Sequence, residues 1–134
     1  MKITKLWLVA LLALSGCVAT AGTSKPLPAI NANLPVVKGM AGGLAGTSVG
    51  RDLSTADKRS ALEAEYRALE YTPGGQSVAW RGAGSSGQVT PAQPYRVGSQ
   101  DCRQYTHTIA AGGDSQSARG TACRNTDGSW TPLT

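Results

Sequence analysis

Two cysteines and a glycine pair in the C-terminal half constrain the fold more than any other feature. Gly112-Gly113 separates two strand-like stretches, 100–111 and 115–124, and suits a two-residue hairpin turn. Counting outward from that turn places Cys102 opposite Cys123, at a non-hydrogen-bonded position where Cα atoms lie about 4.5 Å apart. We therefore predict a disulfide between them, with two free buried thiols as the alternative.

The composition explains why a cross-link is expected. The chain has 134 residues, with 17 glycines, no phenylalanine and 5% aromatic residues, so its core is poor in large apolar side chains. Small domains with weak cores commonly rely on a disulfide. In an oxidising compartment, a bridge closing a loop of about 20 residues contributes roughly 3 kcal/mol.

The N-terminus predicts export and lipidation. Residues 1–5 carry two lysines, and residues 6–14 form an uncharged apolar run. This is typical of a secretory signal peptide, and the run is about half as long as a membrane-spanning helix. The following Leu14-Ser15-Gly16-Cys17 resembles the lipobox of bacterial lipoproteins, in which the cysteine is acylated. We predict a signal peptide over 1–16 and lipidation at Cys17, with palmitate among the acyl chains. The alternative is an ordinary signal peptide with a chance cysteine.

Two segments without apolar periodicity follow. Residues 17–37 contain three prolines, which predicts a lipidated, extended tether, with a loop packed on the domain as the alternative. Residues 38–52 contain Gly42, Gly46 and Gly50 at the spacing of a short glycine zipper, which would let two helices approach closely. Such a helix is too short to span a membrane. We therefore expect weak, lipid-dependent self-association, with a flexible linker as the alternative.

Residues 53–134 predict an α+β domain, in which one N-terminal helix precedes a small antiparallel β domain. Ser54 can cap a helix over 53–71, and Leu62, Tyr66 and Leu69 form its narrow apolar stripe. This stripe indicates packing on the sheet, with binding of a partner as the alternative. Short strands separated by turn residues are expected over 77–81, 88–90, 95–97, 100–111, 115–124 and 129–131.

The sequence contains no recognisable catalytic motif. His107 is the only histidine, and on an alternating strand we expect a surface or half-buried side chain, not a metal ligand. No serine lies in a nucleophile motif, and no glycine-rich loop has the lysine and hydroxyl of a P-loop. The formal charge is +5, or +3 once Lys2 and Lys5 leave with the signal peptide, which is too low for nucleic-acid binding. We expect no catalysis, no cofactor, no metal and no nucleic-acid partner.

Several motifs, taken in order, resemble the rickettsial seventeen-kilodalton surface antigen family of outer-membrane lipoproteins. They are the lipobox, the glycine series ending at Gly50-Arg51, Ala56-Asp57-Lys58-Arg59, Ser77-Val78-Ala79-Trp80-Arg81, Gly87-Gln88-Val89-Thr90-Pro91, Tyr95, Cys102-Arg103-Gln104-Tyr105, Gly120-Thr121-Ala122-Cys123-Arg124 and Asp127-Gly128-Ser129-Trp130. The resemblance implies a Gram-negative outer membrane, surface antigenicity and no known catalysis. Family members typically carry a longer, doubled glycine zipper with a membrane hairpin, and here only its last portion is found. The lipid is therefore expected to be the main anchor.

Together these observations predict an outer-membrane lipoprotein with a structural or interaction role at the cell envelope. Its expected contacts are the membrane, reached through the lipid, and an unknown envelope protein. The alternatives are a periplasmic inhibitor or binding module acting on another envelope protein, and an enzyme, which the missing motifs disfavour.

Overall fold

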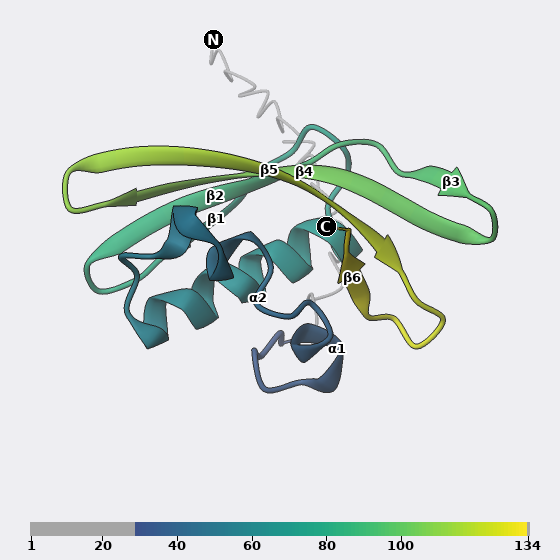
Figure 1. Ribbon diagram of the computed structural model, residues 1–134, viewed down its shortest axis with the longest axis horizontal. Coiled ribbons are helices and arrows are strands. Elements are labelled where there is room, and N and C mark those ends of the chain that lie inside the picture. The colour runs from purple at the N-terminus through teal and green to yellow at the C-terminus, as the bar shows by residue number, and fades with distance from the viewer. Residues whose placement is uncertain (1–28, 134) are drawn as a thin grey trace, which may run out of the picture.

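The computed structural model describes residues 29–133, which form a six-stranded antiparallel sheet with one long helix against one face (Figure 1). The strands are β1 (Val78–Arg81), β2 (Ser85–Pro91), β3 (Tyr95–Val97), β4 (Gln100–Ala111), β5 (Asp114–Arg124) and β6 (Trp130–Pro132). The helices are α1 (Pro35–Lys38), two 3-10 turns, η1 (Leu44–Gly46) and η2 (Ser48–Gly50), and α2 (Thr55–Tyr71). The sheet order is β1-β2-β4-β5-β6, and β3 pairs with β4 beyond the end of β2. The helix and the antiparallel domain are confirmed, while α1 is a second helix that the sequence did not predict. The signal peptide and Cys17 lie outside the described residues.

Helix α2 begins and ends where local sequence rules place its ends. The Ser54 side chain accepts a hydrogen bond from the backbone N–H of Asp57 at 3.1 Å, which satisfies a donor that the first turn leaves free. The helix stops before Thr72-Pro73, because proline disfavours the helical conformation of the preceding residue. Of the predicted apolar stripe, Tyr66 and Leu69 are buried, and Leu62 is partly buried against the core.

The hairpin of β4 and β5 has the predicted register. Ala111 faces Asp114 beside the turn, and Cys102 faces Cys123. The turn residues Gly112 and Gly113 have φ values of +61° and +86°, which glycine adopts at little steric cost. The predicted disulfide is confirmed, with a Cα–Cα distance of 4.0 Å.

Residues 30–52, here called the N-terminal arm, wrap against the domain and differ from two predictions. Val37 and Met40 are fully buried and the residues around them pack on the core, so the end of the predicted tether belongs to the fold. The predicted glycine helix is wrong, because Gly42 has φ +87° and the chain makes only the 3-10 turns η1 and η2 there. Gly50 is needed for another reason, since a Cβ there would overlap the Ala45 carbonyl. The three glycines therefore do not line one face of a helix.

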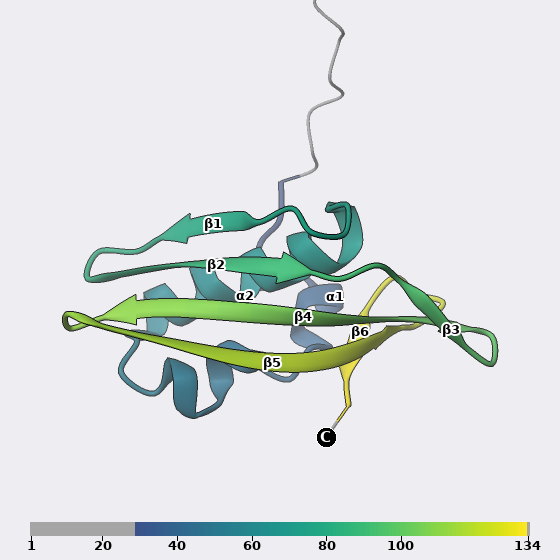
Figure 2. The same cartoon turned by 90° about the horizontal axis from the view of Figure 1, so that it is seen from above.

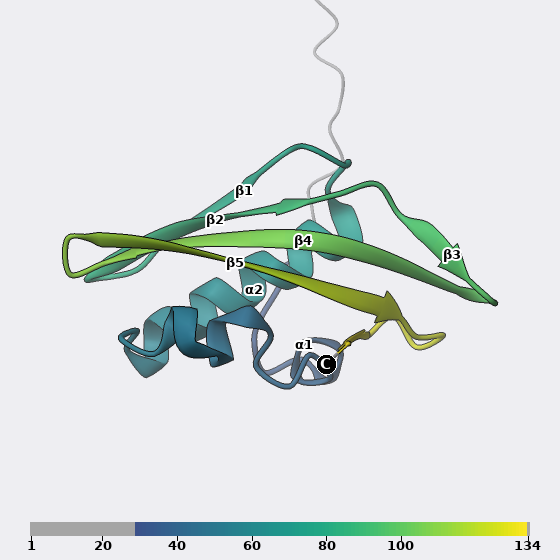
Figure 3. The same ribbon diagram turned by 45° about the horizontal axis from the view of Figure 1, so that its top comes forward.

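The two faces of the sheet differ sharply. Helix α2 and the arm lie against one face, and the described residues leave the other face bare (Figures 2 and 3). Along β4, Tyr105, His107 and Ile109 are buried beneath α2, and the residues between them point to the bare side. We call that side the open face. Its side chains are Ala79, Arg81, Ser86, Gln88, Thr90, Gln104, Thr106, Thr108, Ala110, Ser115, Ser117, Arg119 and Thr121. Among residues 29–133, no helix combines the length and apolar character needed to cross a membrane.

Candidate functional site

A carboxylate at the centre of the core joins the arm, α2 and the sheet. Glu65 of α2 is 0% exposed. It accepts hydrogen bonds from the backbone N–H groups of Leu44 (3.0 Å) and Ala45 (2.8 Å) in the arm. From β4 it accepts hydrogen bonds from the Tyr105 hydroxyl at 3.3 Å and from Nδ1 of His107 at 2.7 Å. Donors to both oxygens stabilise the ionised form, which would otherwise be strongly disfavoured away from water.

The tautomer of His107 follows from its second partner. The indole Nε1 of Trp80 donates to Nε2 of His107 at 2.8 Å. An indole N–H can only donate, so Nε2 carries no proton and Nδ1 carries the hydrogen that goes to Glu65. The imidazole is therefore neutral. Burial, followed by the nearby Glu65 charge, raises the pKa of Tyr105 far above its ordinary value, so its hydroxyl stays a donor.

The arm can reach Glu65 only because of a glycine. Gly43 has φ +54°, and a Cβ at this position would overlap the carboxylate. The next two backbone N–H groups then point at the two oxygens, as in a small anion-binding loop. The loop thus uses a side chain of its own protein as the anion.

The Glu65–His107 pair consists of the residue types of a catalytic acid–base pair, but a substrate could not reach it. Both side chains are 0% exposed, and the imidazole has a protein partner on each nitrogen. A general base must lie within hydrogen-bond reach of the group it deprotonates. In this structure the pair supports the fold.

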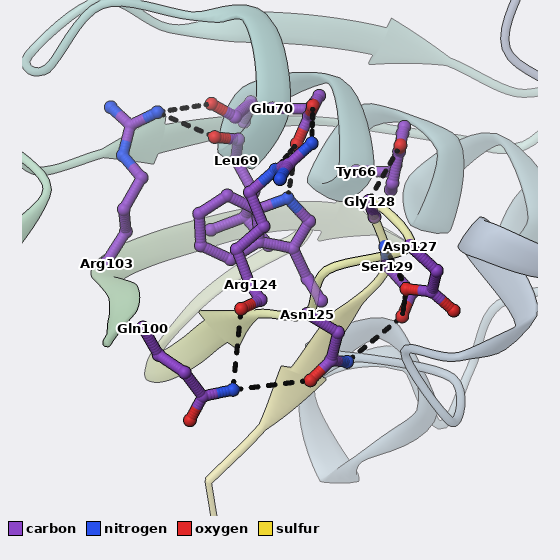
Figure 4. A network of polar contacts seen from close by, with 12 residues as sticks. Tyr66, Leu69, Glu70, Gln100, Arg103, Arg124, Asn125, Asp127, Gly128 and Ser129 are labelled. Atoms are coloured by element: carbon purple, nitrogen blue, oxygen red, sulfur yellow. Dashed lines mark hydrogen bonds and ion pairs between the residues drawn. The ribbon is translucent and has the colours of Figure 1, made fainter. Parts of the chain in front are cut away.

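A second polar cluster joins the C-terminal part of α2 to β5 and β6 (Figure 4). Glu70 accepts two hydrogen bonds from Arg124, at 2.9 and 3.0 Å, and a third from the Trp130 indole at 2.8 Å. Burial raises the pKa of Glu70, but the bonds from Arg124 and Trp130 outweigh it, so the net pKa lies below the ordinary value. One turn away, the Tyr66 hydroxyl donates to the carbonyl of Gly128 in the last turn of the chain.

Two further charged side chains are hydrogen-bonded to neutral groups in place of opposite charges. Arg103 is 5% exposed and donates to the carbonyls of Ala68 and Leu69 at the end of α2, where the helix dipole favours a cation (Figure 4). Burial lowers the pKa of Arg103. At the other end of α2, Asp57 accepts the N–H of Ala83 and the hydroxyl of Ser85, which fixes the β1–β2 turn.

The predicted site residues separate into three groups in the structure. The disulfide lies in the β4–β5 hairpin as expected, Cys17 is outside the described residues, and the glycine series belongs to the arm. His107, expected at or near the surface, is fully buried instead.

Glu65 was missed, although the sequence held a signal. It lies four residues after Ala61 and four before Leu69, on the buried face of α2, where an unpaired charge is unfavourable.

The described part of the surface carries open hollows. One of about 520 Å³ lies between the tips of the β1–β2 and β4–β5 hairpins and is lined mostly by glycine, alanine and serine. Within residues 29–133, no three His, Cys, Asp or Glu side chains are grouped to hold a metal ion.

The comparisons with known proteins agree with the motifs. Residues 67–131 match the family described as 17 kDa outer membrane surface antigen. This region of the chain belongs to that family. The 17 kDa surface antigen of Rickettsia bellii is 44% identical over 85 residues, covering 61% of this chain and 54% of the relative. Those of Rickettsia felis and Rickettsia conorii are 49% and 47% identical over 77 residues, each covering 55% of this chain and 48% of the relative.

The chain therefore spans about half the length of the curated relatives it matches. No solved structure matches it. The region matching the surface antigen family runs from the second half of α2 to β6. It includes Glu70, Arg103 and Arg124, whose side chains hold the helix against the sheet, together with the two cysteines of the disulfide. Several of the motif residues thus explain the fold rather than a reaction.

Proposed function

We propose that this protein is a cell-surface lipoprotein of the Gram-negative outer membrane, held by lipid on Cys17, and that its domain acts by contact rather than catalysis. The observation that carries the non-catalytic part is the location of its ionisable groups. Glu65 and His107 are buried with protein partners on their polar atoms, and Arg103 is bonded to backbone.

The open face supports an interaction role. It consists of small hydroxyl, amide and alanine side chains with two arginines and no acid, spread over β1, β2, β4 and β5. Some of its hydroxyls are paired with each other, such as Thr108 with Ser117 at 2.7 Å. A polar surface of this kind suits hydrogen bonding to another molecule or to water. The relatives named surface antigens support the location, and the lipobox supports the anchor.

The experiment combines lipid labelling with protease treatment of intact cells. Cells grown with labelled palmitate should yield labelled protein in the outer-membrane fraction, and Cys17→Ser should remove the label and block processing by the lipoprotein route. Trypsin added to intact cells should cleave the domain at exposed sites such as Arg81 and Arg119.

The lipid-labelling experiment and the protease experiment can each fail separately. Label retained by Cys17→Ser, or recovery with inner-membrane markers, would refute the anchor. Complete protection in intact cells, with cleavage after lysis, would place the domain in the periplasm and favour a binding module there.

A further inference from the structure

One edge of the sheet has no strand beside it. Strand β6 pairs with β5 only at Ala122, Cys123 and Arg124, and the N–H of Leu133 extends the contact to the Thr121 carbonyl. Among residues 29–133, nothing pairs with the outer edge of β5 over 114–120. Five of these seven residues are exposed and the other two partly exposed. The opposite edge of the sheet is β1, which has only four residues.

The hairpin register identifies the backbone groups that this edge presents. Ala111 and Asp114 flank a two-residue turn and form a hydrogen-bonded pair, so even-numbered β5 residues bond to β4. The N–H and C=O groups of the odd-numbered residues Ser115, Ser117 and Arg119 therefore point outward. The bond from Leu133 to the carbonyl of Thr121, also odd-numbered, agrees with this assignment.

Natural proteins usually protect such an edge with charged side chains, above all lysine, or with proline, a bulge or a covering loop. Residues 114–120 read Asp-Ser-Gln-Ser-Ala-Arg-Gly: the two charges lie toward the ends, at Asp114 and Arg119, and the segment has neither proline nor lysine. The side chains are mostly small, so a second strand can approach. The edge is suited to strand addition.

We propose that a second copy of this chain docks on this edge, with the two β5 strands antiparallel about a two-fold axis at Ser117. In this register Ser117 faces Ser117 of the other copy, and Ser115 faces Arg119 in both directions. All outward N–H and C=O groups of the three residues are then paired. The two open faces would become one continuous surface.

Pairing and charge favour this register over the alternatives. Centring the axis on Gln116 or Ala118 leaves Arg119 or Ser115 without a partner among the three outward residues. A shift that centres the axis on Arg119 places two arginines directly opposite each other, which is unfavourable. Centring it on Ser115 brings the Gly112-Gly113 turn into the ladder and leaves Arg119 without a strand partner. This inference does not depend on the lipid anchor or on the glycine series, so its failure would leave the proposed function standing.

Cysteine cross-linking in native membranes tests the register, with the full unmodified chain as background. Facing residues in a hydrogen-bonded pair have Cα atoms about 5.5 Å apart, within disulfide range. Ser117→Cys should therefore form a reducible dimer under mild oxidation. Ser115→Cys is the matched control, because its two copies would be displaced by about four residues, or roughly 13 Å along the strand. It should not link alone, but should do so when Arg119→Cys is added.

A proline variant tests assembly without chemistry on cysteine. The N–H of Ser117 points away from β4, so Ser117→Pro removes no backbone hydrogen bond within the hairpin and loses only the side-chain bond to Thr108. In detergent, the unmodified chain should sediment as a dimer, and Ser117→Pro should raise the dissociation constant about tenfold or more. An intact Cys102–Cys123 bridge in peptide mapping would show that the variant folds.

Three results would overturn the proposal. They are an unmodified chain that sediments only as a monomer, a Ser115→Cys variant that links as readily as Ser117→Cys, and a Ser117→Cys variant that links only to a different protein.

Discussion

The carboxylate of Glu65 lies at the point where three parts of the chain meet. Its hydrogen-bond donors come from the arm, which precedes α2 in sequence, and from β4, which follows it. Burying a charge is unfavourable unless every polar atom finds a partner, and removing one partner leaves the others unpaired. This single side chain therefore couples segments that are far apart in sequence.

Replacing Glu65 with alanine should lower the free energy of unfolding by about 3–5 kcal/mol, because four buried donors lose their acceptor. Glu65→Gln should recover little, since its amide NH₂ would face donors. Urea unfolding followed by tryptophan fluorescence measures the change. The control is Asp52→Asn at an exposed position, expected within about 0.5 kcal/mol of the unmodified chain. Equal stability of Glu65→Ala and the unmodified chain would contradict this account.

The sequence alone could not reveal this network. Alternation along β4 correctly indicates that Tyr105, His107 and Ile109 share one face, but not that the face lies under a carboxylate. The backbone N–H groups of Leu44 and Ala45 cannot be recognised as donors from their residue types. Their position depends on the turn at Gly43, which exists only in the folded context.

At the scale of elements, local rules were sufficient for three features. The Ser54 cap, the Gly112-Gly113 turn and the cysteine register each depend on a few neighbouring residues and on strand alternation, and all three are observed. The prediction from the glycine series is wrong because four-residue spacing places side chains on one face only where the backbone is helical, and here it is not. Here positive φ values and contacts to Ala45 and Glu65 explain glycines of that segment instead.

Removing the disulfide should loosen the hairpin and the strands beside it. Cys102→Ala is expected to lower the free energy of unfolding by roughly 2–5 kcal/mol, because the bridge spans 21 residues and restricts the unfolded chain. Thermal melting with and without reductant measures this. Addition of reductant should destabilise the unmodified chain and leave the variant unchanged. If Cys102→Ala melted at the same temperature as the unmodified, oxidised chain, the bridge would not be a structural cross-link.

The contact of α2 with β5 and β6 predicts a dependence on pH. The pKa of Glu70 is depressed below its ordinary 4.5, so the folded state binds this proton less readily than the unfolded chain. Its contribution to stability is present above the unfolded pKa and is lost as pH falls through the folded pKa. Glu70→Gln should therefore be less stable than the unmodified chain at pH 7, and the difference should shrink at about pH 3. A difference that stays constant in urea titrations would exclude this origin.

At the scale of the whole molecule, the arm makes the domain larger than its sheet and helix. The apolar side chains of Val37, Met40 and Ala45 are buried and complete the core. The last part of the stretch predicted as a tether, residues 30–37, thus packs on the domain.

Met40→Ala tests this larger domain. Because Met40 is 0% exposed, the loss of its side chain should lower the free energy of unfolding by about 2–5 kcal/mol. Lys38→Ala, two residues away and exposed, is the control and should change stability little. Chemical denaturation measures both. If residues 38–52 did not pack on the domain, Met40→Ala and Lys38→Ala would change the free energy of unfolding equally little.

The open face has a consequence for how the molecule can be recognised by antibodies. Neighbouring side chains on that face come from β1, β2, β4 and β5, which are scattered over residues 78–124 of the chain. An epitope there is discontinuous: no short peptide reproduces it, and it exists only while the hairpin and its bridge are intact. Sera raised against the native protein and directed to this surface should bind whole cells yet lose their signal on a reduced, denatured blot.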